Sequence, residues 1–154
     1  MRRILLAGAL LAGAGPYDIR LLPTAAVPAA AGDARLVFAS SPFGIAVTVD
    51  GVASYDVQVT LAGLPEAGSL GGYSTYIAWA VTSDLKDWRR LGPVGNGTAT
   101  VGPVAFNKFL LVISAEADTA PAAKKGPIVL RGISPSAWLQ SFLTHPLFRG
   151  IPPG

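Results

Sequence analysis

The chain has 154 residues, the length of one domain, and its composition favours an all-β fold. Hydrophobic residues make up 51% and charged residues 14%, which excludes a disordered chain, and 18 Gly with 13 Pro exclude a helical bundle. The net charge of +3 falls to +1 without Arg2 and Arg3 of the leader predicted below, so charge does not favour nucleic acid as a partner. The chain has no Cys, which excludes disulfides and thiolate metal sites.

The N-terminus has the pattern of an export signal. Two arginines precede an apolar run at residues 4–11, and small alanines follow it, as a signal peptidase requires. We expect a signal peptide at residues 1–14, with residue 31 as the latest cleavage position, and a periplasmic or extracellular location. Because the run is too short to span a bilayer of about 30 Å, we expect no permanent membrane anchor.

The globular part is predicted over residues 35–133, as a single antiparallel β-sandwich. Residues 15–34 show no sustained period and are predicted to be a linker. Apolar and polar residues alternate over 45–50 and again over 55–62, which is typical of half-buried strands. Asp50-Gly51 lies between them and predicts a hairpin, whose loop must be odd in length to keep the apolar residues on one face.

The most apolar strands are predicted at residues 73–81 and 109–113. The second is apolar on both faces, as expected of a central strand. In the first, Trp79 is the expected packing centre, provided that its indole N–H finds an acceptor. A sugar-binding platform of Tyr76 with Trp79 is disfavoured because successive residues of a strand point to opposite faces, and these two residues are three positions apart. The residues expected to be buried together between two sheets are Val57, Val59, Ile77, Trp79, Leu111 and Ile113.

Residues 84–90 have the sequence DLKDWRR, in which Asp84 caps a short helical turn or a polar hairpin tip. Three basic residues surround Trp88: Lys86, Arg89 and Arg90. They form a basic aromatic patch suited to phosphate, but two aspartates neutralise part of it, so a solvated turn with Trp88 folded over the sheet edge is the favoured interpretation. The glycines of residues 92–102 lack the lysine and helix start of a phosphate loop and indicate turns.

The chain offers few groups for catalysis. His145 is the one histidine and is expected in an exposed loop. The carboxylates of the folded part are expected to be solvated at turns or on the polar faces of strands: Asp50, Asp56, Glu66, Asp84, Asp87, Glu116 and Asp118. We therefore expect no catalytic, cofactor-binding or metal-binding residues in this chain, and no cofactor.

Residues 134–154 are predicted to form a short helix and a Pro-rich tail. Ser134-Pro135 has the pattern of a helix start. An apolar stripe at helical spacing follows, formed by Trp138, Leu139, Phe142 and Leu143. A helix of about ten residues is unstable in water alone, so it must dock or stay unfolded. We expect these four residues to form an exposed patch for a downstream domain or a protein partner; the alternative is docking on the outer face of the strand at 109–113.

Six stretches of the chain carry a resemblance to a known family: LAGLP at 61–65, YSTYIAWA at 73–80, LGPVGNG at 91–97, VGPVAFNKF at 101–109, ISAE at 113–116 and VLRGISPS at 129–136. They resemble the immunoglobulin-like module that precedes the cupredoxin domains in some secreted bacterial multicopper oxidase-like proteins. This resemblance implies that the sandwich is immunoglobulin-like and has a structural or interaction role. Copper sites of that family need several His and a Cys, so the implied oxidase activity would belong to a downstream region.

The expected function is therefore that of a non-catalytic exported module. LAGLP and the YIAWAV element at residues 76–81 are also similar to the extracytoplasmic β domain of anti-sigma-K-type regulators. A regulatory domain of that type is the alternative, and it would require a transmembrane helix. A small hydrolase or a lectin is the third possibility.

Overall fold

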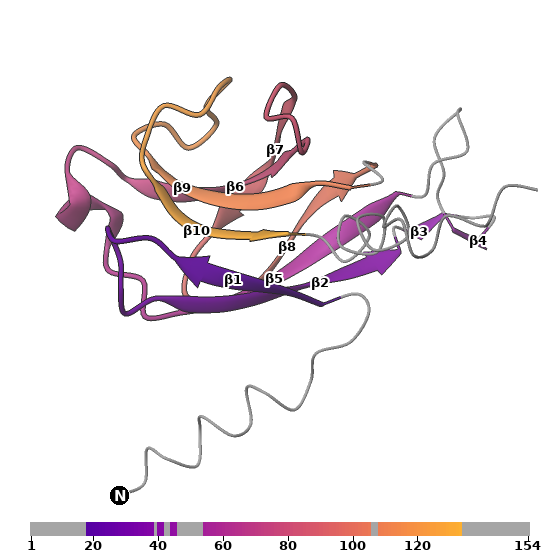
Figure 1. Cartoon of the computed structure of the whole chain (residues 1–154), viewed down its shortest axis with the longest axis horizontal. Coiled ribbons are helices and arrows are strands. Elements are labelled where there is room, and N and C mark those ends of the chain that lie inside the picture. The colour runs from indigo at the N-terminus through magenta and orange to yellow at the C-terminus, as the bar shows by residue number, and fades with distance from the viewer. Residues whose placement is uncertain (1–17, 39, 42–43, 46–53, 106–107, 134–154) are drawn as a thin grey trace, which may run out of the picture.

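The computed structural model describes residues 18–38, 40–41, 44–45, 54–105 and 108–133, and these form an antiparallel β fold (Figure 1). The elements are β1 (Asp18–Pro23), β2 (Ala31–Phe38), β3 (Ser40–Ser41), β4 (Gly44–Ile45), β5 (Tyr55–Ala62), the 3-10 turn η1 (Ala67–Leu70), β6 (Thr75–Val81), β7 (Trp88–Val94), β8 (Gly97–Val104), β9 (Leu110–Glu116) and β10 (Ile128–Ile133). The all-β class is confirmed. No helix in these ranges is long and apolar enough to cross a membrane.

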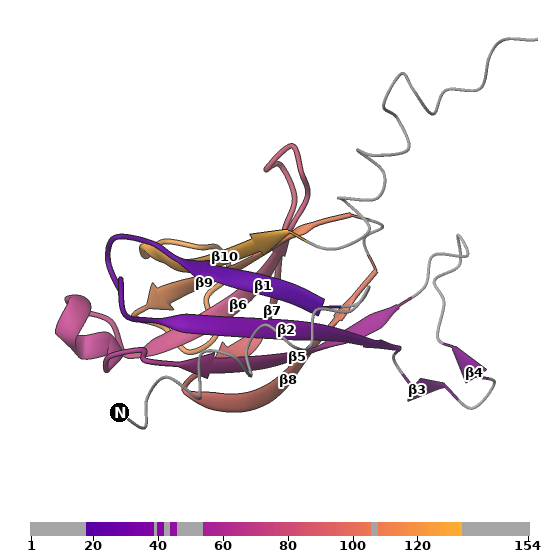
Figure 2. The same ribbon diagram turned by 60° about the horizontal axis from the view of Figure 1, so that its bottom comes forward.

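Eight of the strands form one sheet in the order β7-β6-β9-β10-β1-β2-β5-β8. β1 joins its two halves, because residues 18–21 pair with β2 whereas Leu22 and Pro23 pair with β10. The sheet thereby bends into two layers, with β6, β9 and β10 in one and β2 and β5 in the other (Figures 1 and 2). The strands therefore form one continuous folded sheet, in place of the two separate sheets expected.

The two ends of this sheet meet, which makes the fold nearly barrel-like. β7 and β8 are its edge strands, and only Gly95 and Asn96 separate them in the chain. A Cβ on Gly92 would lie 3.1 Å from Val101 Cγ1, so the glycine permits a close approach of the two edges. The segment predicted to be Gly-rich turns is therefore mostly strand, and that prediction was wrong because Gly and Pro are placed here at sheet edges.

Asn96 fastens this connection to the end of β5. Its Oδ1 accepts a hydrogen bond from the Leu64 N–H at 3.0 Å, and its Nδ2 donates to the Leu64 carbonyl at 2.8 Å. The side-chain amide of Asn96 thus satisfies both the N–H and the carbonyl of Leu64, which lies after the end of β5 and has no strand partner for them there. The turn between β7 and β8 is held in place by this pair of bonds.

The prediction of a linker at residues 15–34 is wrong in its described part. β1 and the first residues of β2 lie within it, and the side chains of Ile19, Leu21 and Ala34 are fully buried. β1 was missed because only two of its residues, Ile19 and Leu21, point into the core before Pro23, which is too few to show an alternating pattern. The folded domain therefore includes Asp18, and does not start at residue 35.

The predicted hairpin between residues 45–50 and 55–62 is also wrong. One edge of β5 pairs with β2 and the other with β8, so no edge is left for a hairpin partner. Ile45 belongs to β4 and pairs with Ser40 of β3, and residues 46–53 lie outside the described part. The alternation within β5 is confirmed, because Val57, Val59 and Leu61 are buried between exposed neighbours.

β6 and β9 are buried on both faces. Their inner faces line the main core with small and aliphatic side chains and with Tyr76, whereas Trp79 lies on the outer face and is 1% exposed. There it belongs to a second cluster, here called the outer cluster, which consists of Ile77, Trp79, Val81 and Val112, with Trp88, Leu110 and Ile128 at its margin. The six residues predicted to pack together are all buried, but Ile77 and Trp79 were assigned to the wrong face.

The reason for this reversal is the curvature of the sheet. Inside a narrow, nearly closed sheet, β6 presents Ala78 and Ala80, which leave room for the opposite layer. The large indole of Trp79 lies on the convex side, where its Nε1 donates to Ser114 Oγ at 2.9 Å. The acceptor that the sequence required for Trp79 is therefore present.

Substitution Trp79→Ala is expected to lower the free energy of unfolding by about 3–5 kcal/mol, because it empties the centre of the outer cluster. Trp88→Ala should cost less, about 1–2 kcal/mol, because Trp88 is only partly buried. Urea denaturation of the two variants measures the difference. A loss for Trp79→Ala below about 1 kcal/mol would show that the outer cluster does not stabilise the fold.

Candidate functional site

The β9–β10 loop, residues 117–127, is anchored by a buried carboxylate. Glu116 is 2% exposed, and its Oε1 accepts a hydrogen bond from the Lys125 N–H at 2.8 Å while its Oε2 accepts one from the Gly126 N–H at 2.8 Å. Ser114 Oγ donates to Oε1 at 3.2 Å and accepts from Trp79. A chain of hydrogen bonds therefore runs from the outer cluster to the loop.

Gly126 is required at this anchor because the backbone comes very close to β9. A Cβ at this position would overlap the carbonyl of Ala115. The neighbouring Pro127 carbonyl accepts from the Ala115 N–H at 3.0 Å, which continues the β9–β10 pairing. The loop therefore leaves and rejoins the sheet at a fixed point.

The prediction that Glu116 is solvated is wrong. β9 remains strand through Glu116, and its outer face carries Val112 and Ser114 before it. A carboxylate in a strand that is apolar on both faces has to be buried and must find donors. The sequence has no Gly, Pro, Asn or Asp between Phe109 and Glu116, and this could have indicated that the strand continues to Glu116.

The turn between β6 and β7 is fixed by its own side chains. Asp84 Oδ1 accepts hydrogen bonds from the Thr82 hydroxyl at 2.6 Å and from the Lys86 N–H at 3.2 Å, and these bonds lower the pKa of Asp84. Thr82 Oγ1 in turn accepts from the Asp87 N–H at 3.0 Å. The prediction of a polar hairpin tip at Asp84 is confirmed, and three hydrogen bonds within the tip define its conformation.

Trp88 follows this turn and lies between it and the β9–β10 loop. Its Nε1 donates to the Leu85 carbonyl at 3.0 Å, and its ring meets that of Trp79 edge to face, with centroids 6.3 Å apart. Lys124 Nζ lies 5.9 Å from the centroid of the Trp88 ring and donates to the Gly126 carbonyl at 2.8 Å. The folding of Trp88 over the sheet edge, as predicted, is confirmed.

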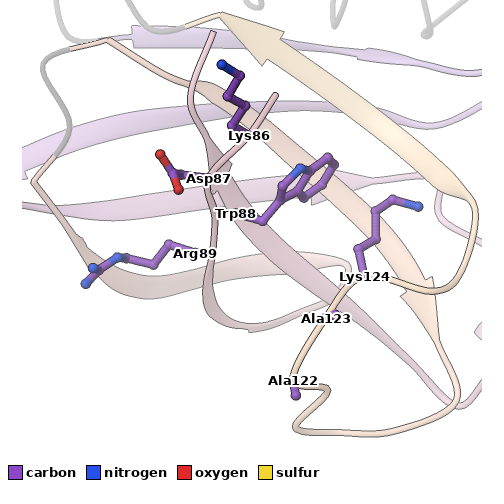
Figure 3. Close-up of a pocket in the computed structure, with 7 residues that line it drawn as sticks. All are labelled: Lys86, Asp87, Trp88, Arg89, Ala122, Ala123 and Lys124. Carbon is purple, nitrogen blue, oxygen red and sulfur yellow. The ribbon is translucent and has the colours of Figure 1, made fainter. Parts of the chain in front are cut away.

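These two segments border an open groove, here called the Trp88 groove, with a volume of about 700 Å³. Figure 3 shows the strand that carries Trp88 on one side and the loop that carries Lys124 on the other. The lining residues are Lys86, Asp87, Trp88, Arg89, Ala122, Ala123 and Lys124. Three cationic side chains and one carboxylate give the lining a positive balance, so the groove is suited to binding an anionic group.

The cations of the groove differ by one residue from those of the basic aromatic patch, which was the disfavoured interpretation of residues 84–90. Arg90 does not line the groove, and its Nη1 donates to the Pro121 carbonyl at 2.8 Å, which ties β7 to the loop. Lys124 takes its place, and it was missed because it is far from Trp88 in the sequence. No local sequence pattern connects Trp88 with Lys124, because the contacts that bring them together, at Glu116 and at Arg90, are made in the folded chain.

The other predicted sites have different outcomes. Trp138, Leu139, Phe142, Leu143 and His145 lie outside the described residues, so the interaction stripe remains a prediction. The sugar platform was disfavoured, and the structure agrees: Tyr76 and Trp79 are buried on opposite faces of β6, and Tyr76 donates its hydroxyl to the Pro65 carbonyl at 2.6 Å. Burial raises the pKa of Tyr76. Among the residues that the structure describes, no three His, Cys, Asp or Glu side chains are grouped as metal ligands would be.

Comparison of the chain with protein-family models, with curated proteins and with solved structures finds no match to any of them.

Substitution Glu116→Gln is expected to lower the free energy of unfolding by about 1–3 kcal/mol, because an amide keeps one acceptor but turns an N–H₂ group toward a backbone donor. Asp118→Asn is the matched control: Asp118 is exposed and its Oδ1 accepts from the Ala120 N–H at 2.9 Å, a bond that Asn can retain. Urea denaturation checks both variants. Equal losses in the two would contradict the role assigned to Glu116.

Proposed function

We propose that this chain acts by binding, as a non-catalytic exported β module with a structural or interaction role. The observation that carries the proposal is the Trp88 groove, in which an aromatic ring and an ammonium group are held in place by contacts to the fold. The buried polar groups beside it, Ser114 and Glu116, are bonded to the loop and to Trp79. Their hydrogen bonds serve to shape this surface.

In its finer form, the proposal is an immunoglobulin-like accessory domain of a multicopper oxidase-like protein. The stretches that carry this resemblance fall largely on core strands: residues 73–80 overlap β6, 113–116 end β9, and 129–131 lie in β10. The described part of the chain contains neither His nor Cys, so it does not offer the copper ligands of that family. The role proposed for the module is therefore contact with another domain or protein.

An extracytoplasmic regulatory domain of the anti-sigma-K type is the alternative. The LAGLP stretch that suggests it lies at the end of β5, where Leu61 and Leu64 are buried. Fractionation of cells that express the full chain separates the two proposals. The accessory module is expected in the soluble exported fraction, whereas a membrane-anchored regulator would sediment with the membranes.

The export proposal predicts where the leader is removed. Cleavage after residue 14 leaves β1 intact, whereas cleavage at residue 31 would remove Ile19 and Leu21 from the core and separate the two halves of the sheet. Mass spectrometry of the exported chain should therefore show an N-terminus ahead of Asp18. An uncleaved chain retained in the cytoplasm would contradict export, and a folded exported chain that begins after residue 31 would contradict the role of β1.

The interaction role predicts the effect of removing residues 134–154. A stop after Ile133 keeps all of β10 and deletes the apolar stripe. We expect an unchanged thermal midpoint and less self-association, because the stripe is proposed to contact a partner. Calorimetry and light scattering measure the two quantities, and a full-length variant with Ser at Trp138, Leu139, Phe142 and Leu143 controls for chain length. A fall of more than about 8 °C would instead show that the tail belongs to the domain's own core.

A further inference from the structure

We propose that the Trp88 groove binds an extended acidic segment of a partner protein, through Lys86 and Lys124 on either side of the Trp88 ring. This inference rests on the proposed interaction role and names the chemistry of the partner. Figure 3 shows the two lysines on opposite sides of Trp88, one from the β6–β7 turn and one from the β9–β10 loop. A chain lying along the groove would meet both cations.

The charge of the lining favours carboxylates. Lys86 and Lys124 contribute two positive charges on either side of Trp88, whereas the side chains of Asp87 and Arg89 project from the opposite side of the strand (Figure 3). Lys86 is held only loosely by the turn, because its Nζ lies 4.0 Å from Asp84 Oδ2 and its side chain is 81% exposed. It therefore keeps donors that an incoming carboxylate can use.

Lys124 is positioned before any partner arrives. Its ammonium group donates to the Gly126 carbonyl and lies over the Trp88 ring, and the carbonyl is fixed because the Gly126 N–H is bonded to Glu116. An ammonium group has three donors, so two remain after the bond to Gly126. Because the side chain is already ordered, binding through it loses less conformational entropy than binding through a mobile lysine.

The same geometry disfavours other anionic partners. The Lys124 ammonium occupies one face of the Trp88 ring, where a sugar ring would have to stack for a glycan. A net lining charge of about +2 is small for a nucleic acid, whose affinity comes from many phosphate contacts. The groove is open to solvent, and the small side chains of Ala122 and Ala123 on the β9–β10 loop leave room for a peptide backbone beside Lys124 (Figure 3).

The test is fluorescence anisotropy of the full-length chain with a labelled peptide of about ten residues that alternates Glu and Ser, and with a Gln and Ser peptide as the neutral probe. Lys86→Gln and Lys124→Gln are each expected to weaken binding of the Glu peptide about two- to fivefold, and the double variant about tenfold. Raising NaCl from about 0.05 M to about 0.5 M should also weaken it.

The matched control is Lys125→Gln. It removes the same charge from the next residue, whose exposed side chain does not line the groove and whose backbone N–H bond to Glu116 is retained. Binding by this variant should stay within about twofold of the unaltered chain, because a charge outside the contact is screened. Thermal midpoints of all variants within about 2 °C of each other confirm that folding is preserved.

Three results would overturn the inference: no binding of the Glu peptide up to about 1 mM, equal binding of the Gln peptide, or equal weakening by Lys125→Gln and Lys124→Gln. Binding of a sulfated polysaccharide in place of the Glu peptide would assign the groove to glycans and would also overturn it. If the peptide fails but the stop after Ile133 still reduces association, the groove assignment is wrong and the interaction role stands. If both fail, the proposed function is wrong as well.

Discussion

The hydrogen bonds of the buried Glu116 carboxylate are the contacts on which the outer cluster and the Trp88 groove depend. A carboxylate taken out of water is costly unless donors replace its hydration, and here the donors are two backbone N–H groups of the β9–β10 loop and the hydroxyl of Ser114. The loop amides need the carboxylate in the same way, because without it their N–H groups would lack a hydrogen-bond acceptor. Strand β9 and the loop are therefore bound to each other at one point.

Two other features follow from this anchor. Ser114 passes the hydrogen bond on to Trp79, which fixes the largest side chain of the outer cluster. On the loop side, the fixed Gly126 carbonyl holds Lys124 over the Trp88 ring, and the Pro121 carbonyl receives Arg90 of β7. The outer cluster and the Trp88 groove are thus both connected to Glu116 by hydrogen bonds. The main core inside the sheet has a different basis: β1 joins the two halves of the sheet, and the edge strands β7 and β8 meet.

The sequence predicted the parts whose signal is local. The alternation of β5, the two apolar faces of β9 and the polar tip at Asp84 depend on neighbouring residues, and the structure confirms them. β1 was missed because two inward residues are too few for a period, and β7 and β8 were missed because Gly and Pro at sheet edges look like turn residues. The face of Trp79 was misassigned because curvature, which decides where a large ring fits, is a property of the whole sheet. The groove depends on Lys124 and Trp88 meeting across the loop, which no local pattern encodes.

The most direct measurement of the anchor is amide hydrogen exchange in the unaltered chain, read at Lys125 and Gly126. If Glu116 holds these N–H groups inside the fold, both amides should exchange slowly, at rates similar to those of β9, although they lie in a loop and not in a strand. Exchange at the rate of an unstructured peptide at both positions would contradict the account.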